Sequence, residues 1–297
     1  MTHEDLRPLM LSIAYRMVGS FSEAEDIVQD AFVRLAVAED SVEFPKAWLT
    51  TVTTRLSIDH LRSARVRREE YPGTWLPEPL LADPAPDAAA RAETADTLSL
   101  ALLVVLESLS PVERAVFLLH DVFDYGYGEI AEIVEKSEEN CRQITVRARR
   151  HVDARRPRFD PSREQREELA RRFFAAVQEG ETEPLVELLA ADVAFYGDGG
   201  GKAPAIGAPM FGAEKVAKLL LGFARVAARD GARVEPIEVN GQPGALAVNA
   251  DGSLISVMAL DIVGGAITAI RSIPNPDKIA HISSTILPSL PPDLKRS

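Results

Sequence analysis

Residues 124–158 read DYGYGEIAEIVEKSEENCRQITVRARRHVDARRPR, a stretch that predicts two short helices joined by a tight turn. Ile130, Ala131 and Val134 share one face of the first helix, and Ser137 stands where an N-cap accepts hydrogen bonds from free backbone donors. Residues at spacings of three and four form the inner face of the second helix: Cys141, Ile144 and Ala148. The pattern is that of a helix-turn-helix.

The outward face of the second helix is polar and is followed by a run of arginines. In a helix-turn-helix the second helix enters the major groove of DNA, where Arg can bond guanine bidentately and Asn or Gln can bond adenine. The residues predicted to face DNA here are Glu139, Asn140, Arg142, Gln143, Arg147 and Arg150. Neighbouring arginines, with Arg150, would meet phosphates: Arg149, Arg155, Arg156 and Arg158. The alternative is an amphipathic helix pair with a solvated arginine face, but the cap, the turn and the one-sided arginines together favour DNA.

The composition indicates an acidic protein with room for two or three domains. The chain has 297 residues, 46% of them hydrophobic, and a formal net charge of -12. This balance disfavours tight non-specific DNA binding, so a partner that helps to hold DNA is expected.

The sequence shows neither an export signal nor a membrane span. A single cysteine, Cys141, excludes an internal disulfide, which predicts a reducing cytoplasm. No cofactor or metal is expected, and without heptads or a dimer seam we expect a monomer.

Residues 1–68 predict three amphipathic helices that pack as a small bundle. The helical patterns cover residues 6–18, 22–35 and 45–65. Ser22 fits an N-cap and Pro45 fits a first helical position. The second helix has acidic residues on its outer side: Glu23, Asp26 and Asp30. The third helix has charged residues on its outer side: Arg55, Asp59, Arg62 and Arg65.

A proline-rich linker, residues 69–92, separates this bundle from a second helical domain, residues 93–157, which ends in the helix-turn-helix. Five prolines in the linker exclude a regular helix or a central strand. Trp75, Leu76, Leu80 and Leu81 are unusually apolar for a solvated tether, which predicts that part of the linker docks on another surface. A merely sticky linker is the alternative.

The third domain, residues 163–290, mixes helices and strands. Helices are predicted over residues 164–179, 183–189 and 213–229. They precede three apolar stretches, VEPIEV, GALAVNADGSLISVMALDI and AITAIRSI, that read as strands divided by glycine turns. The Asp251–Gly252 pair is a strong hairpin signal. Helices followed by antiparallel strands predict an α+β fold in which a curved sheet wraps around a helix.

Both helical domains resemble bacterial sigma factors. EAEDIVQDAFVRL (23–35) and PKAWLTTVTTRLSIDHLRSARVRR (45–68) are similar to region 2, and residues 109–153 are similar to region 4. This pair without the other sigma regions resembles the extracytoplasmic-function (ECF) group. WLPEP (75–79), YGDGGGK (196–202) and NPDK (275–278) are similar to motifs of the ECF subgroup with a SnoaL-like, NTF2-like C-terminal domain. The resemblance covers essentially the whole chain.

The resemblance implies RNA polymerase core and promoter DNA as partners. Glu23, Asp26 and Asp30 would then dock on core polymerase, with a solvated acidic face as the alternative. The third helix and the loop before it would read the −10 element and hold bases of the opened DNA strand in pockets. That DNA strand would run along Arg55, Asp59, Arg62 and Arg65. Region 4 would read the −35 element, although Ile144 and Thr145 replace the Arg-Leu pair of many relatives, so base preference cannot be transferred. Trp48 is expected in the core rather than as a stacking surface.

For the third domain the resemblance implies regulation, with the linker and the glycine loop lying close together so that the DNA-binding domains are held in a chosen geometry. The residues assigned to this regulatory contact are Trp75, Leu76, Pro77, Glu78, Pro79, Asp198, Gly199, Gly200, Gly201, Lys202, Asn275, Pro276, Asp277 and Lys278. The apolar pocket of such a cone leaves room for a small hydrophobic ligand as a further partner. Whether the domain inhibits or activates stays open.

Catalysis is the competing interpretation of the third domain, because some NTF2-like relatives use a buried carboxylate or histidine. The candidates are Asp192, Tyr196 and Asp198, but Asp198 precedes three glycines and Lys202, which indicates a mobile loop rather than a desolvated general base. His281 is expected in the tail, so no enzyme is predicted. A ligand-sensing repressor and a cyclase or isomerase fused to a DNA-binding module remain the alternatives to a sigma factor.

Overall fold

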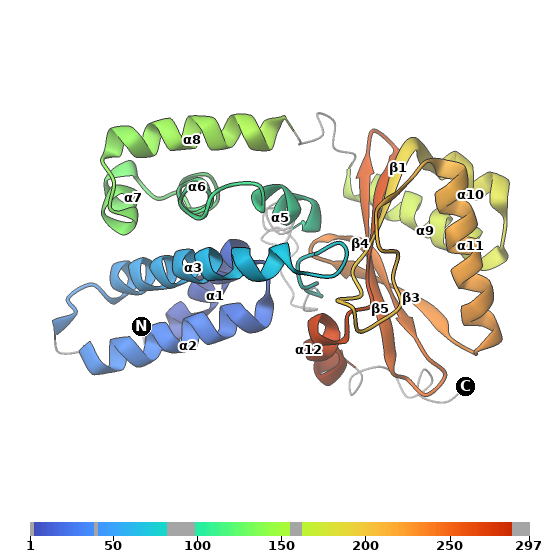
Figure 1. The fold of residues 1–297 in the computed structure, drawn as a ribbon, viewed down its shortest axis with the longest axis horizontal. Coiled ribbons are helices and arrows are strands. Elements are labelled where there is room, and N and C mark those ends of the chain that lie inside the picture. Colours follow the sequence, from blue (N-terminus) through green and yellow to red (C-terminus); the bar gives the residue numbers. More distant parts are fainter. Residues whose placement is uncertain (1–2, 39–40, 82–98, 155–161, 287–297) are drawn as a thin grey trace. The chain divides into compact units, whose positions relative to one another are not determined.

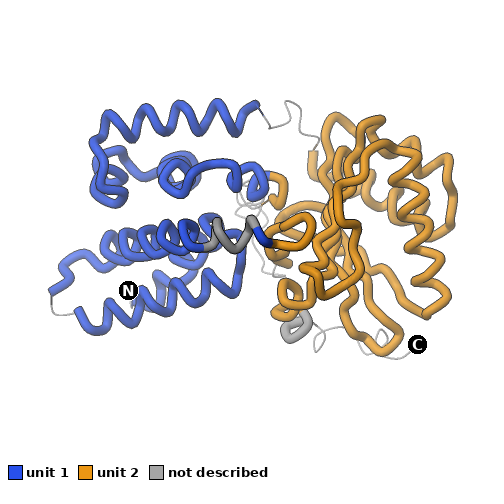
Figure 2. Tube along the Cα trace, in the orientation of Figure 1, with its two compact units in different colours: residues 1–70, 102–156 blue, residues 71–101, 157–297 orange. Residues whose placement is uncertain are grey.

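Figure 1 shows the computed structural model of the chain, which describes residues 3–38, 41–81, 99–154 and 162–286. The chain divides into two compact units (Figure 2). Unit 1 comprises residues 1–70 and 102–156, and unit 2 comprises residues 71–101 and 157–297. The first part of the linker, residues 71–81, therefore belongs to the same unit as the third domain. None of the helices in the described ranges is long and apolar enough to cross a membrane.

The first half of unit 1 is the predicted three-helix bundle. After a single 3-10 turn, η1 (His3–Leu6), the helices are α1 (Arg7–Val18), α2 (Phe21–Ala38) and α3 (Pro45–Glu69). Gly19, with φ of 74°, ends α1 in a left-handed conformation and lets the chain turn into α2. The inner stripe of α2 is buried as its spacing predicted: Ala24, Ile27, Ala31 and Leu35.

The second half of unit 1 contains the helix-turn-helix. Its elements are α5 (Leu100–Leu106), α6 (Pro111–Phe117), a π turn η3 (Leu118–Val122), α7 (Tyr127–Val134) and α8 (Glu138–Asp153). The tight turn is made by Glu135 in the left-handed region, φ 55°, and by Ser137, whose hydroxyl accepts from the Asn140 amide at 3.2 Å. Cys141, Ile144 and Ala148 are buried against the preceding helices. The predicted cap and inner face are confirmed.

Unit 2 has the predicted α+β architecture. Its helices are α9 (Arg163–Glu179), α10 (Thr182–Leu188), α11 (Ala213–Arg229) and α12 (Pro276–Ile286). Its strands are β1 (Leu189–Gly197), β2 (Met210–Phe211), β3 (Arg233–Val239), β4 (Gln242–Val248), β5 (Leu254–Val263) and β6 (Ala266–Ile273). They form one sheet in the order β2-β1-β6-β5-β4-β3, antiparallel except for the parallel pair β1 and β6.

The main core of unit 2 lies between the sheet and the three helices that precede the β3–β6 meander. Phe173 of α9, Leu220 of α11 and Ile270 of β6 are among the buried side chains that meet there. Helix α12 packs against β5 and lies apart from those helices (Figure 1). Strand β1 and helix α12 were not predicted from the sequence. The end of β1 and the start of α12 turn out to position the linker.

Candidate functional site

The recognition helix α8 presents the predicted polar residues to solvent. Glu139, Arg142, Gln143, Arg147 and Arg150 are exposed, and Asn140 is half-buried. Arg142 donates to Glu138 one turn earlier at 2.6 Å and lies 5.2 Å from the Tyr127 ring. Pairing within the same helix face leaves the guanidinium at the surface, where a phosphate or a base edge can compete for it.

A hydrophobic side chain also belongs to this outward face of α8. Val146 is 47% exposed and lies beside Glu139, Arg142, Gln143 and Arg147 around a shallow depression. An apolar group on a groove-facing helix can contact the methyl of thymine. Sequence reasoning missed Val146 because it considered only polar residues outside the inner stripe.

Arg55 of α3, which is predicted to line the path of the opened −10 DNA strand, contacts the helix-turn-helix in this structure. Its Nε donates to the carbonyl of Ile133 and its Nη2 to the carbonyl of Glu132, both at 2.9 Å. These carbonyls belong to the last turn of α7, where a cation also meets the negative end of the helix dipole. Nη1 lies 3.2 Å from the Glu135 carboxylate. Arg55 therefore links the first bundle to the second.

Two further contacts join the bundles within unit 1. The hydroxyls of Thr50 and Tyr125 are 2.9 Å apart, and Thr50 is fully buried. Arg114 of α6, only 1% exposed, donates to the carbonyl of Arg16 at 3.1 Å and to Glu107 at 2.5 Å. Burial lowers the pKa of Arg114 to about 9, which leaves it charged at neutral pH. Unit 1 is a closed arrangement in which both bundles share buried polar contacts.

The other charged residues predicted for the −10 path are placed differently from Arg55. Asp59 and Arg62 are exposed and pair with each other along α3 at 3.0 Å. Arg65 lies in α3, but its side chain falls outside the described residues. The structure does not join Asp59 or Arg62 to the helix-turn-helix.

The loop before α3 forms one wall of a shallow surface pocket. Phe44 is 67% exposed, and Trp48 is half-buried beside it. Arg55 lies on the same pocket wall. The expectation that Trp48 is a core residue is wrong, because its position in the first turn of α3 leaves one side of the ring toward this pocket.

The acidic residues of α2 form a partly solvated face. Asp26 and Asp30 are exposed, and Asp30 pairs with Arg34 at 2.9 Å within the helix. Glu23 is half-buried and lies 2.9 Å from His60 Nε2 of α3. The surface remains available to a basic partner, although Glu23 also joins α2 to α3.

In unit 2 Asp198 directly follows strand β1, and its fully buried carboxylate holds the linker. Oδ1 accepts from the Tyr71 hydroxyl at 2.5 Å and from the Gly200 amide at 3.1 Å. Oδ2 accepts from the Leu76 amide and from Lys278 Nζ, both at 2.7 Å. Four donors satisfy the buried charge, two of them from the linker. We call this arrangement, Asp198 with residues 71–76, Gly200, Asn275 and Lys278, the linker clamp.

Lys278, in the first turn of α12, is the cationic side of the linker clamp. It also donates to the carbonyl of Leu76, and its ammonium lies 4.2 Å from the Trp75 ring and 5.0 Å from the Tyr71 ring. Asn275 donates to the Tyr71 hydroxyl at 2.8 Å. A buried ion pair with extra hydrogen bonds and two aromatic faces fixes the position of the linker more than it adds stability.

The glycines after Asp198 are required by close backbone packing. A side chain on Gly199 would overlap the carbonyl of Ala203, and one on Gly200, which has φ of 58°, would overlap the Asn275 amide. The prediction of a mobile loop around Asp198 is therefore wrong, because Asp198 and Gly199 are buried and bonded. Lys202 is exposed and pairs with Asp277 at 2.5 Å.

The second half of the linker segment lies against the end of strand β3 and the turn that follows it. The Asn240 amide donates to the Leu80 carbonyl at 2.7 Å, and the Leu80 amide donates to Asn240 Oδ1 at 2.8 Å. Leu81 forms a β-bridge with Val239, and His281 Nε2 donates to the Pro79 carbonyl at 3.0 Å. Leu76, Pro77, Glu78 and Pro79 are buried. The linker thus docks as predicted, and His281 lies in a helix rather than in a tail.

We expect the linker clamp to weaken at alkaline pH. Burial, together with the Asp198 carboxylate, raises the pKa of Tyr71 above its ordinary value of about 10. Since the folded pKa is raised, the stabilising effect of the neutral hydroxyl is present below about pH 10 and is lost as the pH rises further. Urea unfolding of unit 2 between pH 7 and 11 should show this decline, and Tyr71→Phe should remove it while costing about 1–3 kcal/mol at neutral pH. An identical alkaline decline in Tyr71→Phe would contradict the assignment.

Comparison with family models identifies both halves of unit 1. Residues 2–67 match sigma-70 region 2, and residues 99–152 match sigma-70 region 4. These ranges contain the bundle of α1–α3 and the helices that end in the helix-turn-helix.

The chain is also similar over most of its length to known proteins. It is 38% identical to the ECF RNA polymerase sigma factor SigJ of Mycobacterium tuberculosis, over 93% of this chain and 91% of that protein. It is 34% identical to the probable ECF RNA polymerase sigma factor SigI of the same species, over 92% of each chain. The crystal structure of M. tuberculosis SigJ matches with a TM-score of 0.75 and 36% identity, covering 93% of this chain and 96% of the other.

Proposed function

The chain belongs to the ECF RNA polymerase sigma factors, and we propose that its third domain restrains promoter recognition by holding the linker between the two DNA-reading regions. Residues 1–68 are assigned to core polymerase and −10 binding, and residues 93–157 to −35 binding. Residues 69–92 are assigned to the linker and residues 163–290 to regulation. The main observation behind the proposal is the buried Asp198 carboxylate, which follows β1 and accepts hydrogen bonds from the linker and from Lys278 of α12.

The proposed −35 contacts rest on the outward face of α8. Its side chains can form hydrogen bonds with base edges, and the exposed Arg147 and Arg150 can meet phosphates. On the side of region 2, the shallow pocket with Phe44, Trp48 and Arg55 is assigned to an opened −10 base. Glu23, Asp26 and Asp30 are assigned to core polymerase.

Replacing Gln143 by Ala should relax base preference at one position of the −35 element. A bidentate amide contact contributes about 1–3 kcal/mol of discrimination, so the preferred base should lose roughly 5- to 150-fold of its advantage. The measurement is transcription by core polymerase plus the variant on a library of −35 sequences. Arg150→Ala serves as the control, because loss of a phosphate contact should weaken all sequences alike and reduce the salt dependence. Unchanged preference at every position would remove Gln143 from the reading set.

The closed arrangement of unit 1 is proposed to be incompatible with promoter binding. Arg55 contacts the last turn of α7, and α8 begins only a few residues later, so the two reading surfaces lie within about one or two helix diameters of 10–12 Å. The −10 and −35 elements are about 25 base pairs apart, which is roughly 85 Å along the duplex. Region 2 and region 4 must separate before both elements can be read.

The linker clamp opposes that separation by shortening the tether between the regions. With residues 71–81 held in one path on unit 2, only residues 82–99 lie outside the docked segment, and these 18 residues add at most about 60 Å to its fixed span. The whole of residues 70–99 would reach about 100 Å. Release of the linker therefore favours the spacing that the promoter requires, and the third domain acts as an inhibitor.

Run-off transcription with core polymerase tests this proposal. The intact chain is compared with a chain ending at residue 157 and with the linker-clamp variants discussed below. The intact chain should require more protein for half-maximal transcription than either of them. Equal or lower activity after release of the linker would contradict inhibition, whereas absence of promoter-dependent transcripts from all forms would contradict the assignment of the reading surfaces.

We infer that the third domain is not catalytic. The Asp198 carboxylate, the best general-base candidate in the sequence, is bonded to four donors, and His281 is bonded to the Pro79 carbonyl. Asp192 is exposed at the surface of β1, away from a desolvated setting. Since the partner is core polymerase, we place the protein in the cytoplasm.

A further inference from the structure

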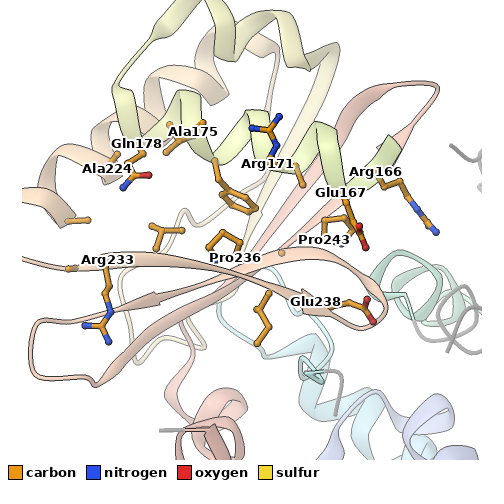
Figure 3. Close-up of a pocket in the computed structure, with 18 of the residues that line it drawn as sticks. Arg166, Glu167, Arg171, Ala175, Gln178, Ala224, Arg233, Pro236, Glu238 and Pro243 are labelled. Carbon is orange, nitrogen blue, oxygen red and sulfur yellow. The ribbon is translucent and has the colours of Figure 1, made fainter. Parts of the chain in front are cut away.

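A large cavity opens in unit 2, and none of the linker-clamp residues is among those that line it. It has a volume of about 990 Å³ and lies between α9, the C-terminal half of α11 and the β3–β4 hairpin (Figure 3). Pockets for small molecules commonly measure 300–1,000 Å³ and are mostly apolar with a few polar groups. This volume lies at the upper end of that range.

The cavity exists because the buried stripe of α11 changes from large to small side chains. In the first half of the helix the stripe is Val216, Leu220 and Leu221, which fill the main core. At the same spacing the second half carries Ala224, Ala227 and Ala228, which line the cavity. Leucines at these three places would fill much of the space, so the alanines leave a groove between α11 and β3.

Polar groups lie at both ends of the cavity, and Arg171 lies between them (Figure 3). Gln178 and Arg233 lie at one end, and Arg166, Glu167 and Glu238 lie at the other (Figure 3). Apolar side chains line the part between them: Phe174, Val177, Ala224, Ala227, Pro236 and Ile237. Positions 166 and 178 are separated along α9 by about 18 Å, at 1.5 Å per residue.

Three arginines of the cavity lining, Arg163, Arg171 and Arg233, are already paired with carboxylates. Arg163 lies 2.7 Å from Glu167 and 3.0 Å from Glu238, Arg171 lies 2.6 Å from Glu168, and Arg233 lies 2.6 Å from Glu235. An anionic ligand that bound to one of these three arginines would have to displace its carboxylate. An uncharged ligand can donate to a carboxylate and accept from an arginine without breaking a pair.

We propose that this cavity binds an elongated, uncharged molecule with an apolar body and hydrogen-bonding groups at its ends. The hairpin gives such a ligand a route to the linker. Ile237, Glu238 and Gly241 line the cavity, and the residues between them, Val239 and Asn240, hold Leu80 and Leu81 of the linker. Occupancy stabilises the hairpin and so tightens the hold on the linker, which makes the cavity an input to the inhibition proposed above.

Binding is tested on the intact protein without polymerase, so that it is judged independently of the proposed function. The probe is the neutral dye N-phenyl-1-naphthylamine, whose fluorescence rises in apolar surroundings. It should bind saturably and be displaced by the linear ten-carbon α,ω-diol at a concentration roughly ten-fold lower than by the dicarboxylate of the same length. Equal displacement by the dicarboxylate, or no saturable binding, would overturn the proposal.

Two variants locate the binding site. Ala224→Trp fills the cavity and should weaken dye binding roughly ten-fold or more, and the smaller Ala224→Leu serves if the tryptophan variant fails to fold. Arg225→Trp is the matched control, since residue 225 is the exposed neighbour of Ala224 outside the cavity lining and its replacement should leave binding unchanged. Wild-type binding by a folded Ala224 variant would place the dye elsewhere.

Hydrogen exchange tests the coupling between the cavity and the linker. With the diol bound, hydrogen exchange in peptides covering residues 76–81 should slow several-fold, because the Leu80 amide is bonded to Asn240. Unchanged exchange at saturating diol would overturn the coupling while leaving the binding site intact. Transcription is not needed for either conclusion.

Discussion

Asp198→Asn should release the linker and destabilise unit 2 by about 3–5 kcal/mol. The substitution keeps the size of the side chain but leaves the Lys278 ammonium, only 7% exposed, without its carboxylate. Removing one partner of a buried pair is costly, because the remaining charge cannot regain its hydration. The amide would also present a donor where Asp198 now accepts from the Leu76 amide and from Lys278.

Thermal unfolding measures the loss of stability, and Trp75 emission reports the linker. The sequence contains two tryptophans, so a Trp48→Phe background isolates Trp75. Trp75 is half-buried beside Lys278, and its emission should shift to longer wavelength when the linker enters water. The same variant should need less protein for half-maximal transcription.

Two controls distinguish the linker clamp from general damage. Asp277→Asn removes a carboxylate that is 62% exposed and paired with Lys202, so its effect should stay within about 0.5 kcal/mol. The double variant Asp198→Asn with Lys278→Gln removes both charges and should be less destabilised than Asp198→Asn alone. If Asp198→Asn melted like the wild type with unchanged Trp75 emission, the carboxylate would have no role in holding the linker.

Arg55→Ala should open unit 1 in the free protein and at the same time weaken the promoter complex. Hydrogen bonds from a charged donor contribute about 1.5–3 kcal/mol each, but the side chain is 45% exposed. We therefore expect about 1–3 kcal/mol for the two bonds together, and little from the solvated Glu135 pair. The closed form should lose roughly 5- to 150-fold of its advantage.

Energy transfer between dyes on α2 and α8 measures the opening. Cysteines at positions 29 and 153, both exposed, are labelled in a Cys141→Ala background, and transfer should fall in Arg55→Ala. Arg62→Ala is the matched control, because Arg62 pairs with Asp59 on its own helix and not with α7. It should leave transfer unchanged while still weakening the promoter complex. Unchanged transfer in Arg55→Ala would mean that this arginine does not hold the bundles together.

The sequence predicted elements whose signals are local. The inner stripe of α2, the Ser137 cap and the Asp251–Gly252 turn depend on residues within a few positions of one another, and each is found in the structure. Strand β1 was missed because ADVAF follows a helical pattern without a glycine or proline to separate them. Helix α12 was missed because NPDK was interpreted as an isolated motif rather than as a helix start.

The sequence identified residues of the candidate site but not the bonds between them. The motif residues Asp198, Asn275 and Lys278 were identified, yet the ion pair and the partners Tyr71 and Asn240 were not. Burial of a carboxylate depends on donors that come from distant segments, and glycines beside it suggested solvent instead. The bond from Arg55 to α7 was likewise missed, because it depends on how two separate bundles pack.

The bonds around Asp198 have a consequence during synthesis of the chain. They join residues separated by 127 positions for Tyr71, 122 for Leu76 and 80 for Lys278. At about 5–20 residues per second, a ribosome needs roughly 10–40 s after making Leu76 before Lys278 appears. Both DNA-reading halves exist once α8 has been completed at Asp153, so for roughly 6–25 s before Lys278 appears they lack this restraint. A message truncated before the Lys278 codon would yield a protein that lacks it permanently.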